Sequence, residues 1–322
     1  MRPPDFWNAK TAQARLALAA LSPLSWAYGA SVRWKRDHAH PYRPDAKVVC
    51  VGNLTTGGTG KTPIAIAVAR ALADRNMRPF ILSRGYGGRA RGPVLVDVAR
   101  DTAQDVGDEP LLLARAAPVI VARQRAAGAE FADSYDAGAI VMDDGFQNFE
   151  IAKDLSFVVA DAATGFGNER VLPAGPLREP VAQGLARANA VILVGDGEPD
   201  LKGFAGPVLR ARLVPVDVVG LNGTDVVAFA GIGRPDKFFD TLRSLGARLA
   251  ETREYADHHA YSASEIARLK AKARGALLVT TEKDYVRLTP QQREGVKFLP
   301  VRAAFDDPAA LSLLLDRIAP AQ

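Results

Sequence analysis

A glycine-rich segment followed by lysine and threonine, GGTGKT at residues 57–62, has the residue types and spacing of a phosphate-binding loop. It follows an apolar run at 48–51 and precedes a helix-like segment at 63–73. Glycines let backbone N–H groups converge on phosphate oxygens, and the next helix adds the positive end of its dipole. Lys61 would then reach the β- and γ-phosphates of a nucleotide, and the Thr62 hydroxyl would bind Mg²⁺.

The match to the general pattern G-x-x-x-x-G-K-[ST] is imperfect, because position 55 is threonine rather than glycine. An ordinary glycine-rich turn between a strand and a helix is therefore the alternative interpretation. The apolar strand before the loop and the helix after it favour nucleotide binding. The residues predicted to bind ATP are Thr55, Gly57, Gly58, Thr59, Gly60, Lys61 and Thr62.

Two adjacent carboxylates, Asp143 and Asp144, come directly after the apolar segment 139–142. In phosphate-loop proteins a carboxylate at the end of a nearby strand holds Mg²⁺, directly or through water. Neighbouring side chains on an extended backbone point in opposite directions, so we expect one of the two to face the metal. Which one does so stays open. A solvated strand end with Asp-Gly turn chemistry is the alternative.

Two loops rich in glycine or proline carry further polar groups. The loop at 83–88 contains Arg84, which could clamp a phosphate, and Tyr86, which could stack on a sugar or a base. In the segment 172–180 three prolines restrict the backbone, which suits the positioning of a substrate or metal by Arg178 and Glu179. The alternatives are a flexible surface loop and a purely structural connection.

Candidates for acid–base chemistry are Asp108 and the adjacent pair His258 and His259. Asp108 precedes a predicted helix, so a plain N-cap is the alternative role. The histidines follow Asp257, and an imidazole beside a carboxylate can act as a general base or orient one. A surface histidine pair is the default interpretation. The lone cysteine, Cys50, and the lack of a second histidine cluster disfavour zinc.

Short β-branched runs alternate with helical segments after residue 45, which is typical of a parallel sheet covered on both faces. This pattern predicts an α/β fold with a P-loop NTPase-like parallel sheet domain at 45–215. A second, smaller α/β domain at 216–322 would close the active-site cleft, and residues 1–44 would form an N-terminal arm. The expected strands are 48–51, 80–82, 94–96, 119–121, 139–142, 157–160, 191–194, 226–230, 277–280 and 297–301, and the expected later helices are 236–245, 264–274 and 308–318.

Composition excludes several classes of protein. One cysteine in 322 residues excludes a disulfide framework. The net charge of +5 is concentrated in residues 1–45, where seven Lys or Arg and three Asp or Glu give +4. The rest of the chain is therefore close to neutral, which argues against nucleic acid as a partner.

The arm has the features of a membrane-interface helix. It holds all three tryptophans, and the segment 16–32 is uncharged and flanked by basic residues. Seventeen residues interrupted by Pro23 fall short of the ~20 apolar residues that span a bilayer. Tryptophan and basic residues at headgroup depth fit a segment that lies in the interface. A signal peptide and a helix packed on the protein body are the alternatives.

Taken together, a series of strings in this chain resembles the tetraacyldisaccharide 4′-kinase family of lipid A biosynthesis. The resemblance runs from the arm to at least Asp284, and the missing glycine at position 55 is normal in that family. The later strings are far more specific than the phosphate loop. In order they are GNL with GGTGKTP, SRGYGG, GDEP, DDGFQ, FGN with LPAGPLREP, AGIGRP, DHH and TEKD.

The resemblance implies transfer of the ATP γ-phosphate to the 4′-hydroxyl of a tetraacylated glucosamine disaccharide 1-phosphate. It implies that Asp108 is the catalytic base and is paired with His258, although the doubled histidine leaves the register open. It also implies a peripheral enzyme on the cytoplasmic face of the inner membrane, and we expect a monomer. The metal ligands implied are Thr62, Asp143, Asp144 and Glu179, and the substrate or anion contacts are Arg84, Tyr86, Arg125, Gln147 and Arg178.

Two functions from other classes remain as alternatives. One is an ATPase or GTPase switch that has no lipid acceptor, although the chain lacks the N-K-x-D guanine signature. The other is a non-catalytic membrane adaptor with a degenerate phosphate loop. The presence of Lys61, Thr62, Asp143 and Asp144 weighs against the adaptor.

Overall fold

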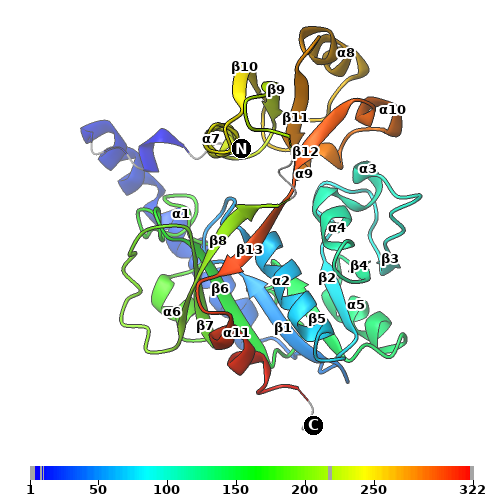
Figure 1. Ribbon diagram of the computed structural model, residues 1–322. Helices are drawn as coiled ribbons and strands as arrows, with labels where there is room; N and C mark the ends of the chain where they lie inside the picture. The colour runs from blue at the N-terminus through cyan, green and yellow to red at the C-terminus, as the bar shows by residue number, and fades with distance from the viewer. Residues whose placement is uncertain (1–3, 8, 10, 217–219, 320–322) are drawn as a thin grey trace.

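The chain folds into a large lobe and a small lobe, each built on its own sheet (Figure 1). The computed structural model describes residues 4–7, 9, 11–216 and 220–319. The large sheet has nine strands in the order β13-β8-β7-β6-β1-β5-β2-β4-β3. Their bounds are β1 Lys47–Gly52, β2 Pro79–Ser83, β3 Val94–Leu95, β4 Val119–Val121, β5 Ala139–Asp143, β6 Leu155–Asp161, β7 Ala190–Val194, β8 Val208–Pro215 and β13 Val301–Phe305.

The sheet is parallel except at its two edges, where β3 is antiparallel to β4 and β13 to β8. The strand β1 lies between β5 and β6, with Val51 opposite Asp143. Carboxyl ends of parallel strands meet at one edge of the sheet, which is where ligands of open α/β folds bind. The phosphate loop after β1 and Asp143 at the end of β5 therefore share one edge.

Both faces of the large sheet are covered at its centre, so the central strands are largely apolar, whereas β8 near the edge carries Arg210 and Arg212. One face packs against α2 (Lys61–Ala73) and α11 (Pro308–Leu315). The other packs against α5 (Arg125–Asp133), α6 (Val181–Leu185) and the loop residue Phe146. The short helices α3 (Ala103–Val106) and α4 (Asp108–Leu113) lie beside β4. The predicted α/β class with a P-loop-type sheet is confirmed.

The small lobe contains a four-stranded parallel sheet in the order β10-β9-β11-β12. Its two faces are covered by separate apolar clusters, one under α7 and the other under α8. The strands are β9 Asp225–Ala230, β10 Arg248–Glu254, β11 Leu277–Thr281 and β12 Val296–Leu299, and the helices are α7 Pro235–Ser244, α8 Ala263–Lys272, α9 Glu282–Tyr285 and α10 Pro290–Arg293.

The end of the chain differs from the expected domain boundary at 216–322. After β12 the chain returns to the large sheet as β13, which pairs with β8. The helix α11 then buries Leu311, Leu314 and Leu315 in the same cluster as α2. The expected strand 297–301 therefore divides between the two sheets, and the segment from Val301 packs with the large lobe. The expected connector at 215–224 includes residues 217–219, which lie outside the described residues.

The arm forms a short 3-10 helix, η1 (Asp5–Trp7), and the long helix α1 (Ala12–Asp37), which continues through Pro23. Its two helices contact the loop at residues 170–174, where the Trp7 indole donates to the Pro173 carbonyl at 3.1 Å and Ala174 N donates to Ser25 Oγ at 3.1 Å. Trp7 is thus bound to the protein and differs from the exposed Trp26. Within the described residues, no helix combines the length and apolar character that crossing a bilayer requires.

Candidate active site

The phosphate loop has the backbone conformation that its glycines predict. Gly60 is the N-cap of α2 and adopts φ 85°, a left-handed conformation that favours glycine. A Cβ at this position would lie 3.3 Å from Val194 Cγ1. The exposed N–H groups at the start of α2 therefore face the edge of the sheet where a phosphate would bind.

Asp143 is buried at the end of β5, and its Oδ1 atom has no hydrogen-bond partner in the structure. Burial, followed by the nearby charges of Glu109 and Asp144, holds the pKa of Asp143 above its ordinary value. An unpaired buried carboxylate oxygen is costly unless a cation or donor joins it. Asp143 is therefore a strong candidate for a cation ligand.

Asp144 has a different environment from its neighbour. Both of its oxygens accept hydrogen bonds from Arg178, at 2.9 and 3.0 Å, and Lys61 Nζ lies 3.8 Å from Oδ1. Burial raises the pKa of Asp144, but the charges of Lys61 and Arg178 outweigh it and the net shift is downward. Asp144 is thus an ionised partner of two cations, and it connects the phosphate loop to the loop that carries Arg178.

The loop at 170–180 is fixed by backbone contacts to the chain just before the phosphate loop. Arg178 N donates to Leu54 O, and Thr56 N donates to Pro176 O, each at 2.8 Å. Thr55 itself forms an isolated bridge with Leu177. These contacts explain how a proline-rich loop, distant in sequence, places Arg178 beside Asp144.

Glu179 is buried, and it is paired with Arg187 through hydrogen bonds of 2.8 and 2.9 Å. Gln147 Nε2 also donates to Glu179 Oε1 at 3.0 Å, and Gln147 Oε1 accepts from Arg178 at 3.2 Å. The structure therefore brings Gln147 and Glu179 into the site, but both Glu179 oxygens are occupied by donors. The sequence contained no signal for Arg187, since nothing in its spacing links it to the motifs.

Arg125 is buried and donates from Nη2 to the Asp143 carbonyl at 3.2 Å, while its Nη1 has no hydrogen-bond partner. Burial lowers the pKa of Arg125, and the neighbouring carboxylates Asp143 and Asp144 act in the opposite direction. A buried guanidinium with a free N–H group is suited to an anion. The predicted anion contact at Arg125 is therefore compatible with its geometry.

The unpaired buried atoms indicate what this edge of the sheet is built to hold. In the part of the chain that the structure describes, Asn53 Oδ1, Thr59 Oγ1, Arg125 Nη1 and Asp143 Oδ1 lack partners and lie in or beside the phosphate loop, and a fifth such atom, Asp257 Oδ1, lies in the small lobe. The phosphate oxygens of a nucleotide would accept hydrogen bonds from the donors among these atoms. A hard cation would be bound by the unpaired oxygens. Among the residues described, no three His, Cys, Asp or Glu side chains converge as a ready metal cage. Nucleotide-bound Mg²⁺ needs only one or two carboxylates, because phosphates and water complete its shell.

The predicted acid–base pair is formed across the two lobes. Asp108, the first residue of α4, lies 3.0 Å from His258 Nδ1. The His259 ring stacks on the Tyr255 ring, with centroids 4.6 Å apart, and His259 also contacts Glu265 at the start of α8. In the structure it is therefore His258 that meets Asp108, whereas His259 packs within the small lobe.

Two cations that the motif reasoning did not assign to the site surround Asp108. Arg287 donates to Asp108 Oδ2 through Nε, at 2.8 Å, and through Nη2. Lys283 lies 3.3 Å from His258 Nε2. Burial raises the pKa of Asp108, but His258, Lys283 and Arg287 outweigh it and hold the pKa well below its ordinary value. Lys283 belongs to the TEKD string, whereas Arg287 had no sequence signal.

Arg84 and Tyr86 lie on an exposed loop after β2. The Tyr86 ring contacts the His258 ring edge-on, with centroids 5.6 Å apart, and it is 68% exposed. Arg84 is exposed and is close enough to Arg125 to influence its charge. Both residues therefore border the site and are accessible to a substrate.

A second contact between the lobes involves Asp161, at the carboxyl end of β6. Arg234 donates to Asp161 Oδ2 and also reaches the Gly58 carbonyl at 3.4 Å, and Lys237 lies 3.3 Å from the same carboxylate. The signal for Asp161 in the sequence is weak, because a strand ending in one Asp is common. The contact holds α7 of the small lobe against the phosphate loop.

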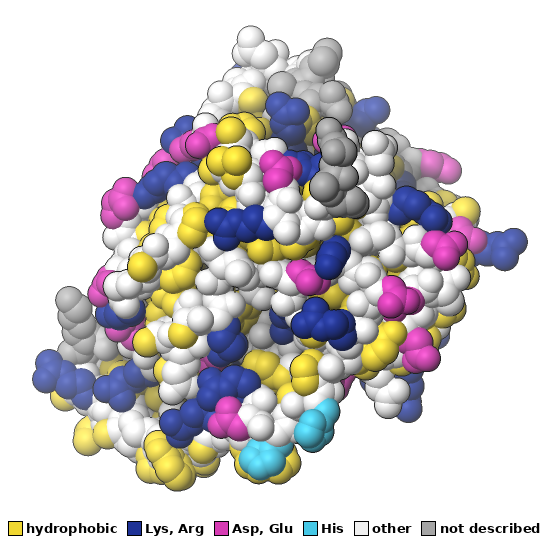
Figure 2. All heavy atoms as spheres, turned by 90° about the horizontal axis from the view of Figure 1, so that it is seen from below, with side chains coloured by type: hydrophobic (Ala, Val, Ile, Leu, Met, Phe, Trp, Pro, Cys, Tyr) yellow, Lys and Arg dark blue, Asp and Glu magenta, His cyan; other side chains and the backbone are white. Residues whose placement is uncertain are grey.

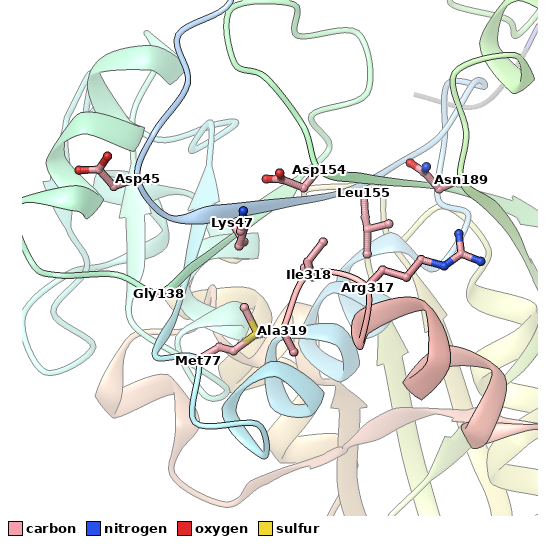
Figure 3. Close-up of a pocket in the computed structure, with 10 residues that line it drawn as sticks. All are labelled: Asp45, Lys47, Met77, Gly138, Asp154, Leu155, Asn189, Arg317, Ile318 and Ala319. Carbon is pink, nitrogen blue, oxygen red and sulfur yellow. The ribbon is translucent and has the colours of Figure 1, made fainter. Parts of the chain in front are cut away.

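A hollow of about 680 Å³ lies away from these groups (Figure 3). Its walls include Lys47 and Leu155, the first residues of β1 and β6, together with Arg317 and Ile318. It therefore opens at the amino ends of the strands, opposite the phosphate loop. The site described above is formed by the carboxyl ends.

Comparison with known proteins identifies close relatives. Residues 17–319 match the family model described as tetraacyldisaccharide-1-P 4′-kinase (LpxK). The tetraacyldisaccharide 4′-kinase of Rhodospirillum centenum is 50% identical over 98% of this chain and 96% of that protein. The one of Paramagnetospirillum magneticum is 49% identical over 99% of each. A crystal structure of LpxK from Aquifex aeolicus, described as an apo form in complex with ATP, matches with a TM-score of 0.76 and 26% identity, covering 94% of this chain and all of that one.

Proposed function

Since the chain belongs to the tetraacyldisaccharide-1-P 4′-kinase family, we propose specific roles for its residues in that reaction. The protein is an ATP-binding lipid A disaccharide 4′-kinase. In this reaction the γ-phosphate of ATP passes to the 4′-hydroxyl of a tetraacylated disaccharide 1-phosphate. Phosphoryl transfer depends mainly on positioning and on stabilising charge, so each role below is one of these two.

The phosphate loop would bind the triphosphate. Residues 57–60 and the start of α2 supply backbone donors, and Lys61 supplies a charge at the β- and γ-phosphates. Arg125 would contribute its unpaired Nη1. Arg178 and Arg84 would bind anionic oxygens at the open side of the site. The support for this part is the cluster of partnerless buried atoms that faces the loop.

Mg²⁺ would be held by Asp143 and the Thr62 hydroxyl, with phosphate oxygens completing its shell. When bound, it would neutralise charge on the phosphates. Asp144 and Glu179 are each paired with an arginine. We therefore propose that Asp144 orients Arg178 and that Glu179 orients Arg187 around the cation. Gln147 bonds to Glu179 and to Arg178, so it links the two pairs.

Asp108 would accept the proton of the substrate hydroxyl, with His258 holding its carboxylate. The base in a loose phosphoryl transfer needs only modest proton affinity, because the proton moves late. Tyr86, which is exposed beside His258, would contact the sugar. This role is supported by the contact between Asp108 and His258, made between one lobe that carries the phosphate loop and another that can close on it.

The arm would attach the enzyme to the membrane that holds the acyl chains. Leu16 and Trp26 on α1 are each 71% exposed, and Leu24 is also exposed. Basic side chains are also exposed on α1, at Arg33 and Lys35, and Figure 2 shows basic and hydrophobic side chains interspersed on the face it displays. Such a mixture suits an interface that contains anionic lipid. We propose peripheral attachment on the cytoplasmic face of the inner membrane, by a monomer.

The observation that carries these assignments is the meeting of Asp108 and His258 across the lobes, at the sheet edge that bears Lys61 and Asp143. The test is mass spectrometry of reactions with ATP, Mg²⁺ and the disaccharide lipid, alongside phosphate release without the lipid. A product heavier by one phosphate, formed only with the acceptor, is expected. Phosphate release that does not depend on the acceptor would instead favour an ATPase switch.

A further inference from the structure

Hydrogen-bond donors are distributed unevenly over the carboxylate of Asp108. Oδ2 receives Nε and Nη2 of Arg287 and lies 3.0 Å from His258 Nδ1, with Lys283 Nζ at 4.0 Å. Among the described residues, the donor recorded on Oδ1 is the backbone N–H of Glu109, at 3.0 Å. A carboxylate has about four lone-pair sites in total. Oδ2 is therefore saturated, whereas Oδ1 keeps capacity for another hydrogen bond.

Asp108 and Lys283 together determine which nitrogen of His258 carries the proton, because the Asp108 carboxylate can only accept from Nδ1. An ammonium group has donors and no acceptor, so the 3.3 Å contact requires His258 Nε2 to accept. The proton of the neutral ring is then on Nδ1, which donates to Asp108 Oδ2. His258 itself adopts φ 60°, a conformation that costs free energy for a non-glycine residue and persists only where surrounding contacts hold it.

Arg287 is held as firmly as the carboxylate it contacts. Its side chain is 6% exposed, and Nη1 donates to the Gly231 carbonyl and to Asp284 Oδ1, each at 2.8 Å. Asp284 is fully buried and accepts further bonds from Gly231 N, Tyr261 and Thr281. The planar guanidinium is thus fixed before it meets Asp108, so its two bonds determine the orientation of that carboxylate.

We propose that Arg287 and Lys283 are positioning residues that occupy Oδ2 of Asp108, directly and through His258, and thereby present Oδ1 as the proton acceptor. This rests on the proposed function, in which Asp108 is the base. The 4′-oxygen bonds to the γ-phosphorus while the bond from that phosphorus to the bridging oxygen breaks. The hydroxyl proton moves to Oδ1, and the electron pair of the broken bond leaves with ADP.

Several charged groups face Asp108 and set its proton affinity. His258 comes from the loop after β10, Lys283 from α9 and Arg287 from just after α9. The carboxylates nearby are Glu109, on the same helix as Asp108, and Asp257, from the loop after β10, and Lys283 lies close to both. Arg287 contributes a positive charge that favours the carboxylate form. Loss of this charge raises the proton affinity of Asp108, so the base becomes protonated at higher pH. The acid limb of the pH profile of kcat must then move to higher pH.

The experiment compares Arg287→Gln and Arg287→Lys with wild type in kcat, in KM for ATP and in the pH dependence of kcat. We expect Arg287→Gln to lower kcat ~10²-fold, as a displaced catalytic group does. Its acid limb should move upward by ~1 pH unit or more, while KM for ATP changes little. Arg287→Lys should restore part of kcat and most of the pH profile. Arg293→Gln is the matched control, since Arg293 bonds backbone carbonyls of the same segment.

A second measurement does not depend on turnover. In ¹⁵N-histidine NMR of the full-length protein, with the His258 signals assigned from His258→Ala, we expect the Nδ1-protonated ring in wild type. Lys283→Met removes the cation beside Nε2 and should increase the share of rings that carry a proton on Nε2, with the Nδ1 proton still donated to Asp108. The same ring population in both proteins, or an unchanged kcat and pH profile in a folded Arg287→Gln protein, would overturn the proposal. Failure of the proposed function would look different, since wild type itself would then transfer no phosphate to the lipid.

Discussion

Arg234 of the small lobe donates a hydrogen bond to Asp161, at the carboxyl end of β6 in the large lobe. The same guanidinium reaches the carbonyl of Gly58 in the phosphate loop at 3.4 Å. Lys237, one turn into α7, approaches the same carboxylate. A buried Asp with two cations from the other lobe therefore links the position of the small lobe to the predicted phosphate-binding loop.

The first prediction concerns this link. Arg234→Ala removes a charge-assisted hydrogen bond, which is worth about 1 kcal/mol or more, so we expect KM for ATP to rise ~5-fold. The free protein should also become more extended in small-angle X-ray scattering. Arg243→Ala is the control, because Arg243 lies on the same helix and pairs with the exposed Asp240. Equal scattering and KM for both variants would show that the link does not hold the lobes.

The second prediction concerns pH. Burial raises the pKa of Asp161, but the hydrogen bond and charge of Arg234 and the charge of Lys237 lower it to about 2. The unfolded value is about 3.9, so the ionised pair contributes stability above about pH 4 and loses it as pH falls toward 2. The Tm advantage of wild type over Asp161→Asn should thus be constant from pH 7 to about 5 and shrink below pH 4. An advantage as large at pH 3 as at pH 7 would contradict the assignment.

The third prediction tests the nucleotide site. Lys61→Ala and Asp143→Asn should each lower kcat by ~10²–10³-fold or more, because each removes charge stabilisation at the phosphates. Folding should survive, and circular dichroism and Tm check this point. For Asp143→Asn the Mg²⁺ dependence of turnover should also move to higher concentration. Near-normal turnover of a folded Lys61→Ala protein is incompatible with the site as described.

The fourth prediction separates the two adjacent histidines. Asp108→Ala and His258→Ala should each lower kcat ~10²–10⁴-fold with little effect on KM for ATP, since proton acceptance matters in the transition state. The double variant should cost less than the product of the two effects, because the residues act as a unit. His259→Ala should keep kcat near wild type and lower Tm, because it removes the stacking on Tyr255. A larger kcat loss at His259 than at His258 would refute the pairing.

The fifth prediction tests the arm without deleting it. Exchange of Leu16, Leu24 and Trp26 for serine should weaken co-sedimentation with anionic liposomes at least ~10-fold, since each large apolar side chain contributes ~1.5–3 kcal/mol when buried. ATP affinity should not change. The control exchanges Val98 and Leu313, which are comparably exposed on other parts of the surface. Equal sedimentation of both variants would show that these α1 side chains do not bind the membrane and that α1 serves only to pack on the protein body.

Local rules were sufficient for the parts of the site that lie on contiguous segments. The phosphate loop with its strand and helix, and the carboxylates at the end of β5, follow from backbone and strand-end chemistry. Residue types also singled out Asp108, the His258–His259 pair and the segment 172–180 as candidates, and the resemblance to a family added the role of each and the pairing of Asp108 with His258. These predictions depend on residues that are close together in the sequence, or on short motifs and their order along the chain. Both can be read from a single sequence.

Contacts between distant segments could not be predicted in the same way. Arg287 and Asp108 are 179 residues apart, and Arg234 and Asp161 are 73 apart. The return of β13 to the large sheet also depends on which sheet edge is free for pairing. Such contacts arise only when two lobes pack together, and an arginine looks the same in sequence whether it faces solvent or a buried carboxylate.

The sequence by itself predicted a phosphate-binding loop at the edge of a parallel sheet, because glycine conformations and strand-end carboxylates act locally. Only the tertiary structure decided that Asp143 keeps a free oxygen while Asp144 pairs with Arg178 and Lys61. It also decided that His258, rather than its neighbour, meets Asp108. The physical reason is burial: the surroundings of a charged group determine its partners, and those surroundings come from segments that the sequence keeps far apart.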